Sequence, residues 1–183
     1  MSEVTQAAER LRMAEHRMIF IDMDGVVSDF DKHVIDLYGK PMEQMTNKEK
    51  DRFWDSECVA FRFFANSPLI EEGELLVRNL KGYGVPISFL TSTGGELQHI
   101  DIAKQKLDFL QKHGMGDLPV AFATGTKSKS DFASANSVLI DDRQKVVSAF
   151  RDRGGVAYLF ERERWQHILN DILSPTTPST GGE

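Results

Sequence analysis

The stretch RMIFIDMDGVVSDF, residues 17–30, decides the fold. It begins with an apolar run and then places Asp22 and Asp24 one residue apart, with Gly25 directly after them. Two carboxylates this close repel each other, and burying them costs free energy unless they are paired or bind a metal. Taken alone, the residues also suit a turn, because Asp and Gly are turn formers. The alternative is a buried strand that delivers two carboxylates to a site, and the rest of the chain distinguishes the two.

The composition is that of a globular protein. The chain has 183 residues, of which 40% are hydrophobic and 27% charged, and its formal net charge is −6. These values disfavour a disordered or membrane protein, and the acidic balance disfavours extended nucleic-acid binding. Cys58 is the sole cysteine, which excludes an internal disulfide and a cysteine-based zinc site and fits a cytoplasmic location. The first 17 residues lack the apolar segment of a signal peptide, and no apolar run is long enough to span a membrane.

Short apolar runs alternate with helical patterns along most of the chain. We expect strands at residues 18–22, 85–90, 119–123, 137–140 and 156–160. Apolar periodicity predicts helices at residues 72–82, 96–113, 143–153 and 162–173. Most of the strand candidates are continuously apolar, as parallel strands covered on both faces are. The alternation predicts the α/β class, with a Rossmann-like, doubly wound parallel sheet.

One segment interrupts this alternation. Residues 31–67 contain no strand candidate and have the pattern of short helices rich in aromatic side chains. The segment is too long for the single helix of a simple strand–helix repeat, so we interpret it as a small helical cap inserted after the first strand. The predicted domains are an N-terminal helix at 1–16, an α/β core at 17–30 and 68–173, the cap at 31–67, and a disordered tail at 174–183.

Polar residues follow four of the predicted strands. Ligands of open α/β sheets bind at the carboxyl ends of the strands, which a parallel sheet brings to one edge. The residues in these positions are Asp22 and Asp24, Thr91 and Ser92, Lys127 and Lys129, and Asp141 and Asp142. Clustered carboxylates suit Mg²⁺, and lysine and hydroxyl groups beside them suit a phosphate. This convergence favours a site over a turn at the end of the first strand.

Four segments, in order along the chain, resemble the motifs of a known family. They are DMDGV (22–26), FLTST (89–93), the lysine loop and LIDDR (139–143), and they resemble the four motifs of the haloacid dehalogenase superfamily of phosphohydrolases. The resemblance covers residues 17–160. The longer form DMDGVVSDF, with a helical segment containing FF after it and VLIDDR near the end, resembles the 5'(3')-deoxyribonucleotidase branch of that superfamily.

The resemblance implies a role for each aspartate. Asp22 is then the nucleophile that forms an aspartyl-phosphate, and Asp24 is the general acid and afterwards the general base. Asp22, the backbone carbonyl of Asp24, and Asp141 are the implied ligands of Mg²⁺. Asp142 is expected to support these ligands from a neighbouring position. The alternative for Asp141 and Asp142 is that one of them is the N-cap of the helix that starts near Arg143.

The resemblance also implies which residues bind phosphate. Thr91 is expected to hydrogen-bond the phosphoryl group, with Ser92 beside it. Lys129 and Lys127 are both candidates for the motif lysine, and the sequence that follows favours Lys129. Lys104 matches a second phosphate-contacting lysine of the branch. Without the other motifs, solvated surface charges would be the favoured interpretation of Lys127 and Lys129, and Lys104 also suits the solvent-facing side of a helix.

Three aromatic residues are candidates for the substrate pocket. Phe30 matches an aromatic that lines the base pocket beside the nucleophile, and Trp54 and Phe64 of the cap are candidates for stacking on a nucleobase. The alternative for the cap aromatics is that they form the small core that a helical insert of this size needs.

The function we expect is that of a Mg²⁺-dependent phosphomonoesterase. Its substrates would be nucleoside monophosphates, with deoxyribonucleotides favoured, and the reaction would pass through an aspartyl-phosphate. One alternative is a phosphatase of the same superfamily that acts on another small phosphoester or on a nucleic-acid 3'-phosphate. A second alternative is a non-catalytic binding protein on this scaffold. The expected partner is a small nucleotide rather than a membrane or a long nucleic acid, and the oligomeric state stays open, a homodimer included.

Overall fold

A computed structural model describes residues 17–94, 99–123 and 129–174 of the chain. The predicted N-terminal helix (1–16) lies outside the described residues, as do Lys127 and all but the first residue of the predicted tail (174–183). None of the helices within the described ranges is long and apolar enough to cross a membrane.

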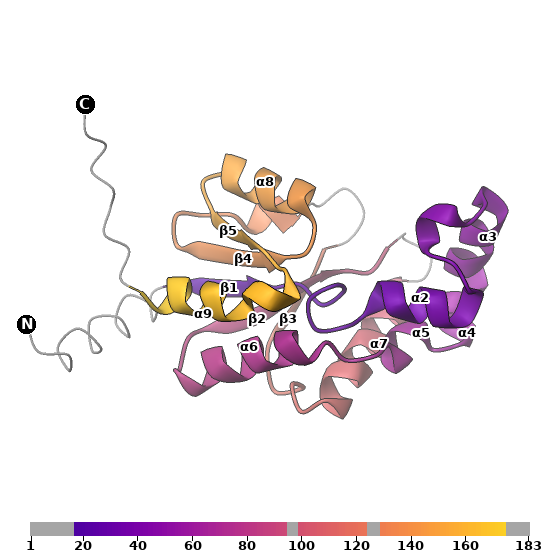
Figure 1. Cartoon of the computed structure of the whole chain (residues 1–183), viewed down its shortest axis with the longest axis horizontal. Coiled ribbons are helices and arrows are strands. Elements are labelled where there is room, and N and C mark those ends of the chain that lie inside the picture. Colours follow the sequence, from indigo (N-terminus) through magenta and orange to yellow (C-terminus); the bar gives the residue numbers. More distant parts are fainter. Residues whose placement is uncertain (1–16, 95–98, 124–128, 175–183) are drawn as a thin grey trace, which may run out of the picture.

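The centre of the fold is a parallel sheet of five strands in the order β3-β2-β1-β4-β5 (Figure 1). The strands are β1 Met18–Ile21, β2 Ile87–Ser92, β3 Val120–Ala123, β4 Ser137–Asp141 and β5 Val156–Leu159. Central β1 pairs in parallel with both β2 and β4, so Ile21 lies opposite Phe89 on one side and Ile140 on the other. The carboxyl ends of the three central strands therefore meet at one edge. This topology confirms the predicted α/β class with a parallel sheet.

The strand predicted at residues 85–90 begins and ends later, as β2 Ile87–Ser92. Pro86 has no N–H to donate to the ladder, so regular pairing begins after it. At the other end, Thr91 still pairs with Phe122 and Ser92 with Ala123 of β3, which extends the strand by two residues. The extension matters because it fixes the backbone of Thr91 and Ser92, two of the predicted phosphate-binding residues, within the sheet.

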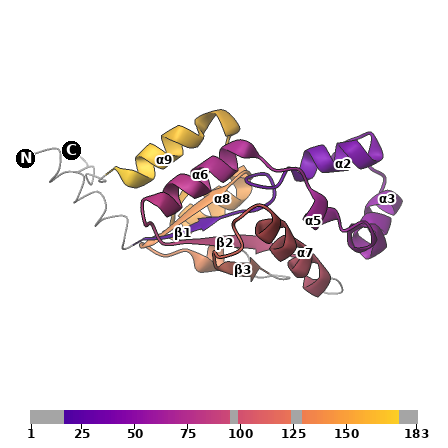
Figure 2. The same cartoon turned by 90° about the horizontal axis from the view of Figure 1, so that it is seen from below.

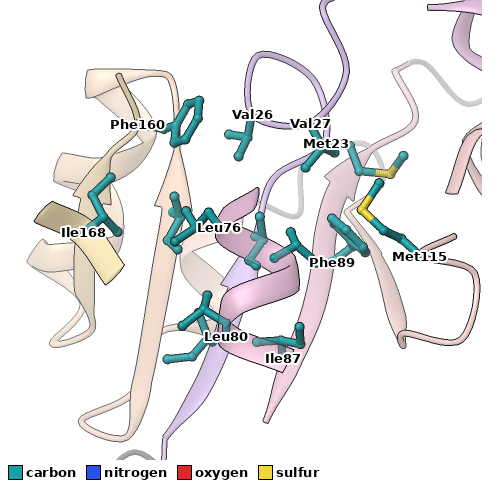
Figure 3. Close-up of a cluster of buried hydrophobic side chains, with 14 of the residues drawn as sticks. Met23, Val26, Val27, Leu76, Leu80, Ile87, Phe89, Met115, Phe160 and Ile168 are labelled. Carbon is teal, nitrogen blue, oxygen red and sulfur yellow. The ribbon is translucent and has the colours of Figure 1, made fainter. Parts of the chain in front are cut away.

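Helices cover both faces of the sheet, as a doubly wound fold requires. They are α6 Glu71–Gly82, α7 His99–Lys112, α8 Gln144–Asp152, and α9 Trp165–Leu173, which follows the 3-10 turn η4 Arg162–Arg164. Helices α6, α7 and α9 pack on the face that carries Ile19 and Phe89, and Figure 3 shows Leu76 and Leu80 of α6 over the strands. On the opposite face, α8 packs against β4 and β5 (Figure 1), and the 3-10 turn η3 Lys129–Phe132 packs against α8 and, through Phe132, on Phe20 of β1.

Between residues 30 and 66, the regular elements of the chain are all helical, in the segment interpreted as a cap. It forms α2 Phe30–Tyr38, η1 Met42–Gln44, α3 Asn47–Arg52, the π-helical turn η2 Phe53–Glu57, α4 Cys58–Ala60 and α5 Phe63–Asn66. These elements lie beyond the carboxyl ends of the strands (Figures 1 and 2). They share a buried cluster that includes Val34, Phe53 and Phe63. The cap therefore has its own core, which was the simpler of the two expectations for its aromatics.

Two sets of contacts join the cap to the core. The two connecting segments run side by side, because Asp29 N donates to Pro68 O (2.8 Å) and Ile70 N donates to Val27 O (2.9 Å). This pairing supports cap boundaries near residues 30 and 68, which stay a prediction. Farther out, α5 packs on α7, where the Phe64 N–H donates to Gln105 Oε1 (3.0 Å). The second half of the cap is thus anchored on a core helix.

Candidate active site

Asp22 stands at the carboxyl end of β1 with its backbone still held by the sheet. Its N–H donates to Ile140 O (2.9 Å), and its Oδ1 accepts from the Met23 N–H (2.7 Å). The chain then turns through Gly25, whose φ of +78° lies in the left-handed region. A Cβ at this position would overlap the carboxylate of Asp142, so the glycine also makes room for an acidic neighbour. The segment DMDG (22–25) thus starts at the end of β1 and leads directly into a tight turn.

Lys129 joins the ends of two strands. Its Nζ lies 2.5 Å from Asp22 Oδ2 and 2.6 Å from Asp141 Oδ2, and all three side chains are almost fully buried. Burial lowers the pKa of Lys129, but the two carboxylates outweigh it, so the pKa lies above its ordinary value and the lysine is charged. This placement supports Lys129 as the motif lysine. Lys127 lies outside the described residues.

The carboxylates of Asp22, Asp141 and Asp142 form a compact cluster. One oxygen from each lies within 4.8 Å of the others. Burial, and then repulsion from Asp22, raises the pKa of Asp141 to about 6, although Lys129 opposes the shift. Burial and the other two aspartates raise the pKa of Asp142 to about 7. The cluster thus holds more negative charge than Lys129 neutralises, and its hard oxygen donors suit a divalent cation such as Mg²⁺.

Asp142 belongs to this cluster directly, whereas the sequence predicted only a supporting position for it. Neither aspartate caps α8, because the N-cap position is Arg143 and has no side-chain capping hydrogen bond; Asp141 Oδ1 accepts from the Arg143 N–H (3.0 Å) directly before the helix. The side chain of Asp24 is engaged elsewhere, and its predicted contribution to the metal, through its backbone carbonyl, stays a prediction.

Lys106 is a site residue that the sequence analysis missed. Its Nζ donates to Asp24 Oδ2 (2.6 Å), to Thr91 Oγ1 (2.7 Å) and to the backbone carbonyl of Ser92 (2.7 Å). The side chain is 1% exposed and its Nζ lies 5.0 Å from the ring centroid of Phe64. The available signal was helix phase: position 106 falls on the apolar face of α7, which also carries Ile102, Phe109 and Leu110.

The same helix phase places Lys104 on the opposite side of α7 from the sheet, and its role in phosphate binding stays a prediction. Its side chain is exposed on α7, and it is absent from the lining of the pocket. The resemblance to the deoxyribonucleotidase branch suggested Lys104 as the second lysine, but the turn of the helix brings Lys106 to the sheet. Thr91 itself is fully buried, while Ser92 is exposed and lines the pocket.

A pocket of about 660 Å³ lies between the sheet edge and the cap. Asp22, Asp24 and Lys129 line its inner end. Phe30, Trp54 and Phe64 line it from the cap side, with the Phe30 and Trp54 rings inclined by only 15° and their centroids 6.4 Å apart. The three predicted pocket aromatics thus border the pocket, and Phe30 also packs on Phe63 of the cap core.

An ion pair at the base of the cap also borders the pocket. Arg162 Nη2 donates to Asp29 Oδ2 (2.6 Å), while the other oxygen of Asp29 accepts from the Lys32 N–H (3.2 Å) and caps α2. Both members of the pair line the pocket. The sequence gives no signal for this contact, because Asp29 and Arg162 lie in different parts of the chain and meet only through the fold.

Comparisons with known proteins support the fold. No family model and no curated protein matches the chain. A solved hydrolase from Streptococcus pneumoniae TIGR4 is 13% identical with a TM-score of 0.54, and the match covers 85% of this chain and 99% of that one. A HAD-superfamily hydrolase from Ehrlichia chaffeensis is 11% identical with a TM-score of 0.50, over 86% of this chain and 96% of that one. Identities this low show the fold alone. The chain therefore has the α/β fold of haloacid dehalogenase-superfamily hydrolases.

Proposed function

We propose that the protein is a Mg²⁺-dependent phosphomonoesterase that acts on nucleoside monophosphates through an aspartyl-phosphate. The observation that carries the proposal is the placement of two buried lysines on two aspartates at one end of a pocket. Lys129 pairs with Asp22 and Lys106 pairs with Asp24, on carboxylates that lie two residues apart. In this arrangement the proposed nucleophile, Asp22, and the proposed proton donor, Asp24, each have their own cationic partner, which suits phosphoryl transfer.

In the first step, a carboxylate oxygen of Asp22 attacks the phosphorus of the substrate. The bond from phosphorus to the leaving oxygen breaks, and Asp24 gives its proton to that oxygen. An ionised aspartate needs no base to activate it, and Lys129 holds the Asp22 carboxylate in a fixed orientation. The alcohol of the substrate then leaves.

In the second step, water attacks the phosphorus of the aspartyl-phosphate. Asp24, now ionised, takes a proton from this water, and the bond between phosphorus and the Asp22 oxygen breaks. Inorganic phosphate leaves and Asp24 is again protonated. We expect Thr91 and Ser92, at the end of β2, to donate hydrogen bonds to the phosphoryl oxygens during both steps; of the two, Ser92 lines the pocket.

Asp22, Asp141 and Asp142 are the residues that would hold Mg²⁺. When bound, the ion supplies positive charge that offsets the charge of the phosphoryl oxygens. Burial, and then repulsion between the neighbouring aspartates, raises the pKa of Asp141 and of Asp142, and a cation bound here would offset both effects.

The aromatic wall of the pocket supports a nucleotide as the substrate. A volume of about 660 Å³ lies within the range of small-molecule sites. Phe30, Trp54 and Phe64 present ring faces and edges that would stack on a nucleobase, with the phosphate at the aspartates. The preference for deoxyribonucleotides rests on the resemblance of DMDGVVSDF to the deoxyribonucleotidase branch.

A substrate panel tests the proposal. The purified protein is assayed with Mg²⁺ on all common ribo- and deoxyribonucleoside monophosphates, with 5' and 3' phosphates, and on a set of sugar phosphates. We expect nucleotides to give the highest kcat/KM. Faster turnover of sugar phosphates would mean that the enzyme is a phosphatase for another small phosphoester. No turnover of any compound, with nucleotide binding retained, would favour a non-catalytic binding protein.

A further inference from the structure

We infer that Lys106 is a positioning residue, which fixes the carboxylate of Asp24 and the hydroxyl of Thr91 in the orientations that proton transfer and phosphate binding need. The inference rests on the proposed function and adds a residue that acts through two others. It also gives the lysine a role other than direct contact with phosphate.

The hydrogen bonds of Lys106 leave no donor for a substrate. A lysine ammonium has three N–H donors and no acceptor. Its three short contacts, to Asp24 Oδ2, Thr91 Oγ1 and the Ser92 carbonyl, use all three donors. The side chain is 1% exposed, and it is absent from the lining of the pocket. The ammonium of Lys106 therefore has no free donor for a phosphoryl group, whereas the Thr91 hydroxyl, which is equally buried, keeps its own proton.

These contacts dictate which atoms of Asp24 and Thr91 face the reaction. Because Lys106 can only donate, Thr91 Oγ1 must accept, and its own hydroxyl proton is left to donate to a phosphoryl oxygen. Because Oδ2 of Asp24 is engaged, Oδ1 is the oxygen left to carry the transferred proton. A single ammonium thus orients the acid/base and the hydroxyl of adjacent strands together.

The cap also contacts the ammonium group of Lys106, through Phe64. The Phe64 ring lies 5.0 Å from Nζ, and the Phe64 N–H is fixed on Gln105, the residue before Lys106 in α7. Excluding water strengthens charge-assisted hydrogen bonds, since no solvent competes for the donors. The docking of α5 on α7 therefore protects the contacts that orient Asp24.

The two lysines of the site have different tasks, and this difference is testable. Lys129 contacts the nucleophile and the metal cluster, whereas Lys106 contacts the acid/base. Loss of Lys106 should impair proton transfer more than substrate binding. The loss should also depend on the leaving group, because a poor leaving group needs a proton and a good one does not.

The experiment compares Lys106→Met with Lys112→Met, which removes an exposed lysine of the same helix. On a nucleoside monophosphate we expect Lys106→Met to lower kcat by about 100-fold, a typical contribution of acid–base catalysis, with KM nearly unchanged. In single turnovers with p-nitrophenyl phosphate, the formation of phospho-enzyme should fall by less than about tenfold, and its hydrolysis should become rate-limiting. Lys112→Met should behave as the parent in both assays.

A double-mutant cycle shows whether Lys106 acts through Asp24. In an Asp24→Asn background, Lys106→Met should cost about tenfold less than in the parent, since the group that it orients is already disabled. Lys106→Gln, which keeps a donor and removes the charge, serves the same tests if the methionine variant does not fold.

The outcomes separate this inference from the proposed function. A raised KM with unchanged kcat would make Lys106 a substrate contact and overturn the inference, as would equal losses for good and poor leaving groups. Additive losses in the cycle would also overturn it. If the parent hydrolyses no phosphomonoester at all, the proposed function fails, and the inference fails with it.

Discussion

Lys129 Nζ lies 2.5 Å from Asp22 Oδ2, with both side chains 4% exposed. The lysine comes from a 3-10 turn before β4 and the aspartate from the end of β1, so the contact joins two neighbouring strands at the candidate active site. Asp141 shares the same ammonium. A buried cation between two buried anions is required for stability as well as for orientation, and this double requirement gives the first prediction.

Lys129→Met should destabilise the protein and abolish phosphatase activity. Removing one member of a buried ion pair leaves uncompensated charge, which typically costs about 3–5 kcal/mol. Chemical denaturation at neutral pH measures the loss, and Mg²⁺ should restore part of it by neutralising the aspartates. Lys145→Met, an exposed lysine of α8, provides the control and should leave stability nearly unchanged. A Lys129 variant as stable as that control would contradict the pairing.

Gly25→Ala should lower activity by about tenfold or more, because the new Cβ overlaps the Asp142 carboxylate and displaces it. Gly39→Ala is the matched control: its φ of +69° imposes similar backbone strain, but its Cβ would meet nothing within 4 Å. Each alanine should cost about 1–3 kcal/mol of stability, measured by thermal unfolding. Only Gly25→Ala should lose turnover, and equal losses from both would argue against a role for the Asp142 position.

Removal of the metal should be visible without an activity assay. Millimolar Mg²⁺ should raise the melting temperature of the parent protein, because a ligand that binds the native state stabilises it. Asp141→Asn should lose this response, since the substitution removes a carboxylate from the cluster. Asp152→Asn, at an exposed position of α8, should keep it. A full response to Mg²⁺ in Asp141→Asn would place the ion elsewhere.

Protonation of His33 should destabilise the protein as the pH is lowered. Burial lowers the pKa of His33 from its ordinary value of 6.5, with Asp36 opposing the shift and Lys32 adding to it. At His33 the unfolded chain therefore binds more protons than the native state below about pH 6.5, so the contribution of His33 to the free energy of unfolding decreases there. His33 lies on Phe63, with ring centroids 4.4 Å apart, and its Nδ1 is 3.2 Å from Ser67 Oγ.

As the pH falls from about 7.5 to 5.5, His33→Gln should gain stability relative to the parent, because the variant lacks the destabilising protonation of His33. Asp141 and Asp142, whose raised pKa values act in the opposite direction, contribute equally to both proteins. Denaturant unfolding at several pH values, for the parent and the variant, measures the difference between the two curves. His113 keeps its own contribution in both proteins, because burial lowers its pKa as well. His167→Gln, at an exposed position of α9, should leave the curve unchanged. Parallel curves for His33→Gln and the parent would rule out the assigned cause.

The sheet and the convergence of Asp22, Lys129 and Asp141 could be predicted from the sequence. Continuously apolar strands alternating with helices favour one topology, and that topology brings the strand ends together whatever the side-chain details are. The proposed boundaries of the cap likewise follow from the absence of a strand pattern between the first strand and the helix at Glu71–Gly82.

Side-chain orientation was harder to predict. Lys106 and Lys104 differ only in the phase of α7, and the family spacing favoured the residue that the helix turns toward solvent. Asp142 joins the acidic cluster because the turn at Gly25 leaves space for it, a contact between segments more than a hundred residues apart. Contacts of this kind depend on tertiary packing, which local patterns do not record.

The central claim is that Asp22 carries the phosphoryl group, and the direct measurement is to trap it there. The enzyme is mixed with a deoxyribonucleoside monophosphate labelled in its phosphoryl group, quenched in acid during turnover, and digested. We predict label on the peptide that contains Asp22 in the parent, more of it in Asp24→Asn, and none in Asp22→Asn. Steady turnover in the parent with no label on that peptide, or undiminished turnover by Asp22→Asn, would contradict the account.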